Sequence, residues 1–365
     1  MVLPWLAPNP RCRRGQAFAD AQRNVVDPAA LPDMSALKGV PHAPTPLHSL
    51  PALAERFGVA ELRVKDESQR WGFGAFKALG GVFAVHEFLR THEERPPADV
   101  TFTTASSGNH GRSVAWGAQL AGARCVIFLP RFTSAEKEAA IRARGAEVIR
   151  IDGDYDTAVA ECRRQAEGNG WTLISDTSWS GYEKTPRDVM RGYMVLADEI
   201  LRQWPDGPTH LFVQAGVGGL AAAVIGYLWA RMVQHPVSVV VEPASADCWF
   251  QSNLAGKPAL ASGDAGTAMG GLACREISPV TWPVIGLGAD WFMTIEEDEV
   301  TPARKLFAHP PGGDPALASG PSGCAGLAGL MRACADETAR RTLGLDKGAR
   351  VLLINSEGNL GERPA

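Results

Sequence analysis

The stretch "VTFTTASSGNHGRSVAWGAQLAGARCVIFLP", residues 100–130, decides the fold class. It begins with a strand-like run over 100–105 and passes through a polar glycine turn into a helical pattern over 111–122. It ends in the continuous apolar run "RCVIFLP" over 124–130. Such a run is typical of a strand buried on both faces, as the strands of parallel sheets are. The stretch therefore predicts a β-α-β unit.

The same alternation of strand and helix continues on both sides of this unit. Thr133, followed by Glu136, predicts a capping box at the start of a helix over 133–146, and Gly145 suits its end. The other expected strands cover 61–66, 147–151, 171–175, 210–216, 237–243 and 349–358, and the other expected helices cover 76–90, 156–168, 186–204, 219–233 and 323–341.

This alternation predicts an α/β protein with two open, mostly parallel sheets flanked by helices on both faces. We expect a small domain over 81–189 inserted into a large domain formed by 1–80 and 190–365. Sheets of this kind bind ligands at the carboxyl ends of their strands. Three glycine-bearing motifs follow expected strands there: "SSGNHG", "QAGVGGL" and "SEGN".

Composition excludes several classes of function. The chain has 365 residues, of which 45% are hydrophobic and 21% charged, as in ordinary globular proteins. A net charge of −4 argues against binding to nucleic acid or to an anionic membrane. No apolar run reaches the about 18 residues of a membrane-spanning helix. The seven cysteines are scattered without metal-ligand spacing, which favours reduced thiols, a cytoplasmic location and no metal.

Two of the glycine motifs are candidate anion-binding sites. "VQAGVGGLAAAV", residues 213–224, reads as a strand, a glycine turn and the start of a helix, where backbone N–H groups and the helix dipole favour a phosphate. A tight strand-to-helix turn without a ligand explains it equally well. In "SSGNHG", Ser106, Ser107 and Asn109 present hydroxyls and an amide at a helix start that suits a carboxylate. His110 beside them fits a structural role.

Lys77 stands out within "RWGFGAFKALGG", residues 70–81. Its small and apolar neighbours predict a buried amine with a depressed pKa, since burial penalises the charged form. A neutral amine can form a Schiff base with an aldehyde. A phosphate site, a carboxylate site and such a lysine together suggest pyridoxal 5'-phosphate acting on an amino acid. The alternative is that Lys77 is an ordinary surface lysine without a chemical role.

These and further segments resemble one known family. "SSGNHGRSVAWGAQLAGARCVIFLP", "SDTSWSGYEKTPRDVMRGYMVLADEI", "QAGVGGLAAAVIGYL", "MGGLACREIS", "SGPSGCAGLAGL" and "INSEGN" appear in order, after "VKDESQRWGFGAFKALGG". They resemble diaminopropionate ammonia-lyase, of the tryptophan synthase β-like class, fold type II, of pyridoxal phosphate enzymes. The resemblance covers about residues 40–360 and implies that the large domain binds the cofactor.

The resemblance also implies a role for each matching residue. Lys77 is similar to the Schiff-base lysine that acts as acid and base, and Asp176 to the base for the L-isomer of the substrate. Asn109 would contact the 3′-oxygen of the cofactor, and Ser356 its pyridine nitrogen, which a hydroxyl leaves mostly unprotonated. The phosphate loop would be Gly216, Val217, Gly218, Gly219 and Leu220, and the substrate-binding residues Ser106, Ser107, Gly108 and His110. A helix cap or turn is the alternative for Asp176.

Two residues depart from the family pattern. The ammonia-lyases carry an aspartate in place of Ser107, where it is associated with deprotonating the D-isomer, and "SSGNH" is what serine and threonine dehydratases of this fold carry. Gly74 replaces an asparagine just before the lysine. Serine cannot act as a base at neutral pH without a partner. We therefore expect poor turnover of D-substrates and elimination from L-amino acids with a β leaving group.

Four functions fit these residues. The first is an α,β-eliminating ammonia-lyase that converts 2,3-diaminopropionate to pyruvate and ammonia. A dehydratase acting on L-serine or L-threonine, a β-replacement synthase and a non-catalytic amino-acid sensor are the alternatives. The resemblance implies a homodimer, with a small amino acid as substrate.

Overall fold

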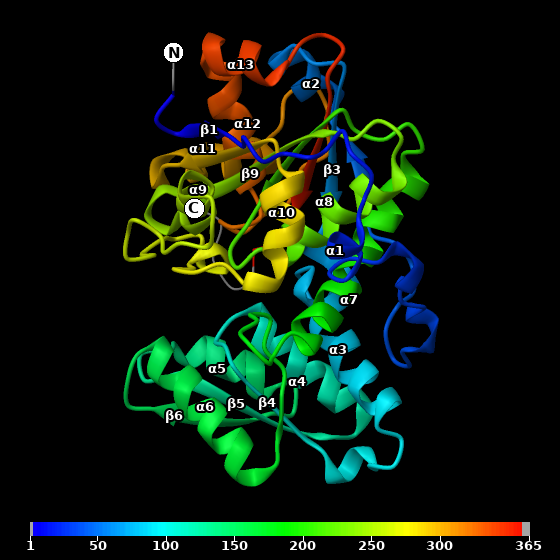
Figure 1. Ribbon diagram of the computed structural model, residues 1–365, viewed down its shortest axis with the longest axis vertical. Coiled ribbons are helices and arrows are strands. Elements are labelled where there is room, and N and C mark those ends of the chain that lie inside the picture. Colours follow the sequence, from blue (N-terminus) through cyan, green and yellow to red (C-terminus); the bar gives the residue numbers. More distant parts are fainter. Residues whose placement is uncertain (1–2, 360–365) are drawn as a thin grey trace. The chain divides into compact units, whose positions relative to one another are not determined.

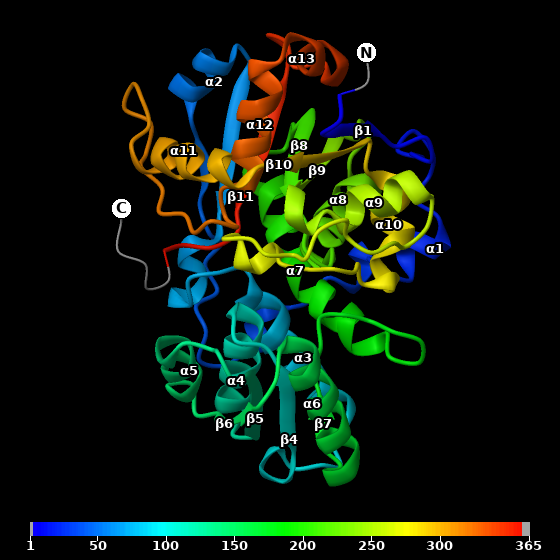
Figure 2. The same cartoon turned by 90° about the vertical axis from the view of Figure 1, so that its left-hand side faces the viewer.

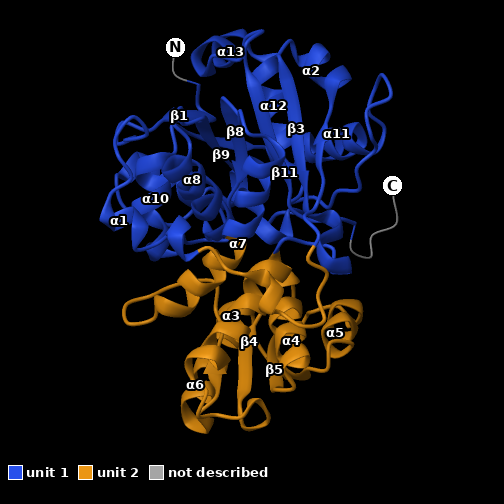
Figure 3. Cartoon of the chain, turned by 90° about the vertical axis from the view of Figure 1, so that its right-hand side faces the viewer, with its two compact units in different colours: residues 1–30, 43–76, 194–365 blue, residues 31–42, 77–193 orange. Residues whose placement is uncertain are grey.

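The computed structural model describes residues 3–359, which form two compact units (Figure 3). The first unit contains residues 1–30, 43–76 and 194–365 of the chain, and the second contains residues 31–42 and 77–193. Residues 31–42 belong to the second unit, whereas the sequence assigned them to the large domain. The reason is packing, because Gly39 lies against the side chain of Leu120.

The first unit is built on a seven-stranded sheet with the order β1-β10-β9-β8-β11-β3-β2. The five central strands run parallel, and only the edge strands β1 and β2 pair antiparallel to their neighbours. The strands are β1 (Leu6–Pro8), β10 (Trp291–Ile295), β9 (Val237–Pro243), β8 (His210–Gln214), β11 (Arg350–Asn355), β3 (Glu61–Asp66) and β2 (Leu47–Ser49).

Helices cover both faces of this sheet. Alternate strand residues such as Phe212, Val241 and Leu353 share one apolar core with α12 (Ala325–Ala335). Figure 2 shows α12 on one side of the sheet and α8 (Gly219–Arg231) with α10 (Trp282–Gly288) on the other. The remaining helices of the unit are α1 (Asp20–Arg23), α2 (Pro51–Phe57), α9 (Cys248–Ala255), α11 (Glu297–Ala308) and α13 (Glu337–Leu343).

The second unit contains a four-stranded parallel sheet with the order β6-β5-β4-β7. Its strands are β6 (Glu147–Ile151), β5 (Arg124–Pro130), β4 (Thr101–Ala105) and β7 (Thr172–Leu173). Figure 1 shows α4 (Asn109–Ala121) and α5 (Ala135–Arg142) along one face and α6 (Tyr155–Asn169) along the other. Val126 and Phe128 pack with Cys162 of α6, as the alternation along a buried strand requires. Helix α3 (Lys77–Thr91) and the first half of α7 (Lys184–Gln203) complete the unit.

The two mostly parallel sheets confirm the predicted fold class, and the differences are local. The capping box at Thr133 was wrong, because Ser134 is the N-cap and its hydroxyl accepts from the N–H of Lys137. Strand β7 is shorter than the expected 171–175, since the N–H of Ser175 donates to the hydroxyl of Tyr182 instead of to the sheet. The expected helix over 323–341 is two helices, α12 and α13, because Asp336 caps a new one.

Three further observations concern the described part of the chain as a whole. None of its helices is long and apolar enough to cross a membrane. Within residues 3–359, no group of three or more histidine, cysteine, aspartate or glutamate side chains is placed to hold a metal ion. All seven cysteines lie in this part and carry free thiols.

Candidate functional site

Lys77 is the first residue of α3 and follows a loop with an unusual backbone. Trp71 has a φ of +53°, and the glycines at 72 and 74 have φ values of +68° and +97°. A left-handed conformation is strained for a residue as bulky as tryptophan, and such strain persists only where the surroundings fix it. At the other end of the loop, the N–H of Phe76 donates to the carbonyl of Ser356 at 3.0 Å.

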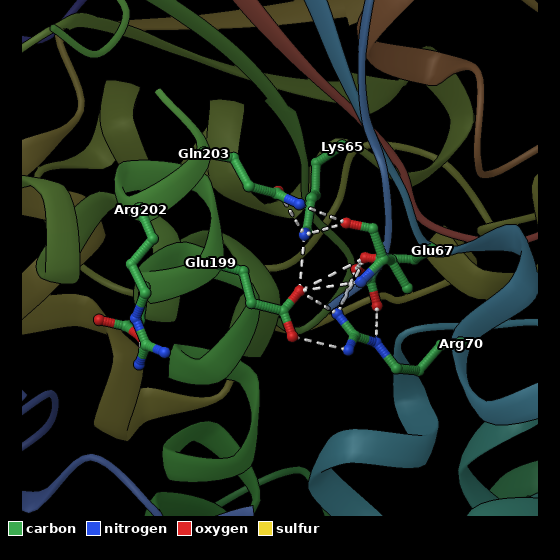
Figure 4. A network of polar contacts seen from close by, with 8 residues as sticks. Lys65, Glu67, Arg70, Glu199, Arg202 and Gln203 are labelled. Atoms are coloured by element: carbon green, nitrogen blue, oxygen red, sulfur yellow. Dashed lines mark hydrogen bonds and ion pairs between the residues drawn. The ribbon is translucent and has the colours of Figure 1, made fainter. Parts of the chain in front are cut away.

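A buried polar network holds the start of this loop (Figure 4). Arg70 is almost fully buried, and its Nε and Nη2 donate to the two carboxylate oxygens of Glu67, both at 2.7 Å. Its Nη1 and Nη2 also donate to Glu199 on α7, at 2.8 and 2.7 Å. Two carboxylates thus surround one guanidinium, which gives the pairing a fixed geometry.

Lys65 completes the network and balances its charge. Its buried Nζ lies 2.6 Å from Oε2 of Glu199 and donates to the carbonyl of Thr45 at 2.8 Å and to Oε1 of Gln203 at 3.0 Å. Burial lowers the pKa of Lys65, and the carboxylate of Glu199 opposes that shift. With two positive and two negative side chains, the network carries no net charge. Its buried charges are paired, as their desolvation requires.

Lys77 itself is paired with Asp176. Its Nζ donates to Oδ2 of Asp176 at 2.6 Å, and the two side chains are 18% and 19% exposed. Burial alone would raise the pKa of Asp176, but the neighbouring ammonium of Lys77 outweighs burial, and the pKa lies below its usual range. The small and apolar residues around Lys77 in the sequence did not predict this ion pair. The carboxylate partner lies 99 residues further along the chain.

His110 and Tyr193 border the same pair. Nε2 of His110 lies 2.9 Å from the carbonyl of Ile174, so this nitrogen carries the proton, and Nδ1 lies 3.9 Å from Oδ2 of Asp176. Burial lowers the pKa of His110. The ring of Tyr193 lies 5.8 Å from Nζ of Lys77, and burial raises the pKa of its hydroxyl to about 12. An amine, a carboxylate and an imidazole thus meet in the second unit.

The "SSGN" turn follows β4 and leads into α4. The hydroxyl of Ser106 accepts from the N–H of Gly108 at 3.3 Å, which closes the turn. Ser107 is half-buried. Nη1 of Arg112 donates to Oδ1 of Asn109 at 2.9 Å, and this assigns the orientation of the amide. Nδ2 is therefore the end that Asn109 would present to an anionic oxygen.

The glycine loop after β8 is closely packed in the first unit. Gly218 has a φ of +105°, and a Cβ there would collide with the ring of Trp249. The carbonyl of Gly216 accepts from Nε1 of Trp249 at 3.0 Å, and that of Val217 accepts from the N–H of Ser278 at 2.9 Å. These contacts turn the carbonyls of the loop toward the protein.

The N–H groups of the same loop have no such partners. Within residues 3–359, the N–H groups of Gly216, Val217 and Gly218 donate to no hydrogen bond. Helix α8 begins at Gly219, and no side chain caps its start. Free N–H groups at an uncapped helix start favour a bound anion such as phosphate. This observation favours the anion site over a turn without a ligand.

Ser356 lies directly after β11 and is buried. The side chain of Gln214, the last residue of β8, donates through Nε2 to the Ser356 hydroxyl oxygen at 3.0 Å. Gln214, Tyr193 and Arg70 are three candidate site residues that the sequence did not single out. Gln214 carried a signal, because it ends a buried strand just before the glycine motif.

The chain matches the family model described as pyridoxal-phosphate dependent enzyme over residues 40–357. It is 38% identical to a diaminopropionate ammonia-lyase of Escherichia coli over 87% of this chain and 85% of that protein. It is 39% identical to a diaminopropionate ammonia-lyase of Salmonella typhimurium, over 87% and 86% of the two chains. The solved structure of the Escherichia coli enzyme in complex with an aminoacrylate-PLP azomethine reaction intermediate superposes with a TM-score of 0.86 and 36% identity, covering 97% and 93% of the two chains.

Proposed function

Since this chain belongs to the pyridoxal-phosphate dependent enzymes and, among them, to the diaminopropionate ammonia-lyase family, we propose that it eliminates ammonia from L-2,3-diaminopropionate. The products are pyruvate and two molecules of ammonia, with one molecule of water consumed. The observation that carries the proposal is the pair of Lys77 and Asp176, 2.6 Å apart. It supplies the amine that the cofactor requires and a base for the substrate.

The residues present fit pyridoxal 5'-phosphate. The N–H groups of the glycine loop, from Gly216 to Leu220, would hold its phosphate, and Nδ2 of Asn109 would donate to its 3′-oxygen. The hydroxyl of Ser356 would face its pyridine nitrogen, and Nζ of Lys77 would bond to its aldehyde carbon. When bound, the cofactor accepts the electron pair that Cα of the substrate releases.

Asp176 and Lys77 divide the proton transfers. Asp176 stays ionised and takes the proton from Cα of the L-isomer. Lys77, displaced by the substrate amine, protonates the β-nitrogen as the Cβ–N bond breaks, so that this nitrogen leaves as ammonia. A Cα–Cβ double bond forms from the released electron pair. The 2-aminoacrylate that leaves the enzyme then reacts with water to give pyruvate and the second ammonia.

The polar turn before α4 would bind the substrate carboxylate. Ser106, Ser107 and Gly108 precede a helix start whose N–H groups favour an anion. His110 stays neutral beside Asp176, because burial lowers its pKa. A neutral imidazole adds no positive charge that would compete with Lys77 for the carboxylate of Asp176.

A dehydratase acting on L-serine or L-threonine is the second candidate, and Ser107 favours it, because the "SSGNH" turn is typical of that class. A hydroxide leaving group needs protonation just as an amine does, and Lys77 could supply it. The two activities differ in the substrate that is preferred, not in the residues that hold the cofactor.

A turnover assay on the cofactor-loaded protein tests the proposal. L- and D-2,3-diaminopropionate, L-serine and L-threonine are offered in parallel, and 2-oxo acid and ammonia are measured. Pyruvate with two equivalents of ammonia from the L-diamino acid supports the lyase. Preferred turnover of the hydroxy amino acids supports the dehydratase. No product from any of them, although Lys77→Ala abolishes the absorbance of the bound cofactor, would favour a synthase or a sensor.

The enzyme is proposed to act as a cytoplasmic homodimer. Seven free thiols suit a reducing compartment, and the dimer is what the family resemblance implies. Sedimentation equilibrium of the loaded protein gives the mass directly. A monomer at assay concentration that retains full turnover would exclude a required dimer.

A further inference from the structure

Gln214 stands in an unusual set of hydrogen-bond partners. Its side chain is buried at the end of β8, and Nε2 lies 3.0 Å from each of three oxygens: the carbonyls of Ser322 and Ile354 and the hydroxyl of Ser356. Its Oε1, by contrast, accepts no hydrogen bond within residues 3–359. The amide therefore uses its donor end only.

The two carbonyls fix which end of the amide faces Ser356. A backbone carbonyl can only accept, so Ser322 and Ile354 require the nitrogen of Gln214 and would repel its oxygen. An amide rotated by half a turn would place Oε1 against the two carbonyls, which cannot donate a hydrogen bond. Only the Ser356 hydroxyl could then donate to Oε1. The orientation thus follows from the chemistry of the neighbours and not from one contact alone.

This orientation decides how Ser356 can use its hydroxyl. The amide nitrogen has no lone pair to accept a proton, so the O–H of Ser356 cannot donate to it. Ser356 donates to no other residue between 3 and 359, although it is buried. Its proton therefore remains available for a ligand, and a buried hydroxyl with an unused donor is uncommon.

We propose that Gln214 is a positioning residue that keeps the Ser356 hydroxyl a donor toward the pyridine nitrogen of the cofactor. This inference rests on the proposed function, in which Ser356 faces that nitrogen. By occupying the carbonyls of Ser322 and Ile354, Gln214 also removes the acceptors that would otherwise compete for the Ser356 proton. A nitrogen that accepts a hydrogen bond from a hydroxyl stays unprotonated, which favours elimination over transamination.

A double-mutant cycle on the holoenzyme tests the coupling. The variants are Gln214→Met, Ser356→Ala and both together, each loaded with [¹⁵N]pyridoxal 5'-phosphate, and the pyridine ¹⁵N resonance is the readout. Methionine keeps the length of the side chain but frees the two carbonyls for the Ser356 proton. We expect Gln214→Met to move the resonance in the direction of Ser356→Ala and to weaken cofactor affinity about tenfold, as the loss of one hydrogen bond implies. The double variant should add nothing to Ser356→Ala.

The controls separate positioning from stability. Gln22→Met removes another buried glutamine, whose Nε2 donates to the carbonyl of Pro283 at 2.9 Å, and should leave the resonance in place. Gln214→Glu serves if the methionine variant does not fold, because its carboxyl oxygens offer Ser356 an acceptor. If the resonance does not move in a cofactor-loaded Gln214 variant, or if the shifts in the cycle are additive, the role of Gln214 is overturned and the proposed function is unaffected. Failure of the wild type to bind the cofactor through Lys77 overturns the proposed function together with this inference.

Discussion

Nζ of Lys77 lies 2.6 Å from Oδ2 of Asp176, and both side chains are supplied by the same unit. One begins a helix and the other follows a short strand, so the pair is made by the fold and not by local sequence. In the proposed reaction, the amine joins the cofactor while the carboxylate remains to take a proton from the substrate. The ion pair thus places two groups that act at adjacent carbon atoms.

Asp176→Asn should abolish most of the turnover while leaving the cofactor bound. The amide is close in shape to the carboxylate but cannot accept the Cα proton, and a general base contributes about 100- to 10,000-fold to such steps. We expect kcat for L-2,3-diaminopropionate to fall by that factor, with the absorbance of the bound cofactor retained. Asp188→Asn is the matched control, since Asp188 is also buried and pairs with Lys184 at 2.9 Å. An equal loss of kcat in both variants would contradict a role as base.

Lys77→Met should raise the pKa of Asp176. In the folded chain Lys77 is the first of the charges that lower this pKa, and burial works in the opposite direction. Removing the ammonium takes away the group that opposes burial most, so the carboxyl should bind a proton at a higher pH than in the wild type. Titration of ¹³C-labelled aspartate by NMR, with Asp176→Asn to assign the resonance, measures the shift. An unchanged titration would show that the ion pair is not maintained in solution.

Arg70→Met should destabilise the protein and loosen the loop before Lys77. It leaves the buried carboxylates of Glu67 and Glu199 with Lys65 alone, and breaking a buried ion pair costs about 3–5 kcal/mol. Unfolding in urea gives the loss of stability. Hydrogen exchange of the amides of Phe73 and Phe76 gives the loosening, because both are protected by loop hydrogen bonds.

Arg332→Met is the control for this loss. Arg332 pairs with a glutamate at 2.7 Å in a more exposed place, so its removal should cost less and leave exchange in the loop unchanged. Arg70→Lys should recover only part of the stability, because an ammonium cannot bind two carboxylates in the same fork geometry. Full recovery by lysine would mean that only the charge of Arg70 matters.

The sequence predicted the β-α-β architecture because its signals are local. Buried parallel strands are short apolar runs, and glycines mark the turns between them, so residues 100–130 suffice to recognise a unit. The helix start at Ser134 was missed by one residue, because either hydroxyl of the adjacent threonine and serine can cap a helix and only the backbone decides between them. Residues 31–42 were misassigned because their partner, Leu120, is remote in the chain.

In the candidate site, too, the residues with local sequence signals were predicted, and the contacts between remote residues were not. Lys77 was recognised by its neighbours, but its environment depends on Asp176, and no spacing between the two predicts a contact across 99 residues. The role of Gln214 depends on carbonyls at 322 and 354, which carry no side-chain signature at all. Backbone acceptors of this kind become visible only in a folded structure.

Glu87→Gln should lower the free energy of unfolding at neutral pH, and the difference from wild type should disappear in acid. Hydrogen bonds from Arg90, and then Arg191, lower the pKa of the buried Glu87 to about 2 in the folded chain, against an ordinary value of 4.5. A lowered folded pKa stabilises the protein above the unfolded pKa, and this contribution disappears as the pH falls from about 4.5 toward 2. We expect a difference of about 1–2 kcal/mol at pH 7, reduced because Arg90 is half exposed.

Urea unfolding of wild type and variant across this pH range measures the difference. Glu161→Gln is the matched control, because Arg164 holds the pKa of Glu161 at about 2 as well, but on the surface of α6. Its effect should be clearly smaller, since solvent screens an exposed pair. A difference at Glu87 that stayed constant down to pH 2 would point to packing and not to charge.

Ser107→Asp should extend activity to the D-isomer. The resemblance to diaminopropionate ammonia-lyase implies an aspartate at this position, and an acidic side chain at the start of α4 is favoured by the helix dipole. Wild type should convert L-2,3-diaminopropionate well and the D-isomer poorly, because, of the two bases that the resemblance implies, this chain keeps Asp176 and has serine in place of the other. In the variant, kcat/KM for the D-isomer should rise by about tenfold or more, within the range of a general base.

Turnover of the L-isomer should change little in this variant, because Asp176 still serves it. Ser106→Asp is the control, since it adds the same charge one residue earlier, at a side chain that closes the turn through the N–H of Gly108. A gain for the D-isomer in both variants would reflect charge near the substrate and not a base at position 107. Equal turnover of the two isomers by the wild type would show that a group other than Ser107 already removes the D-proton, and Lys77 would be the first to test.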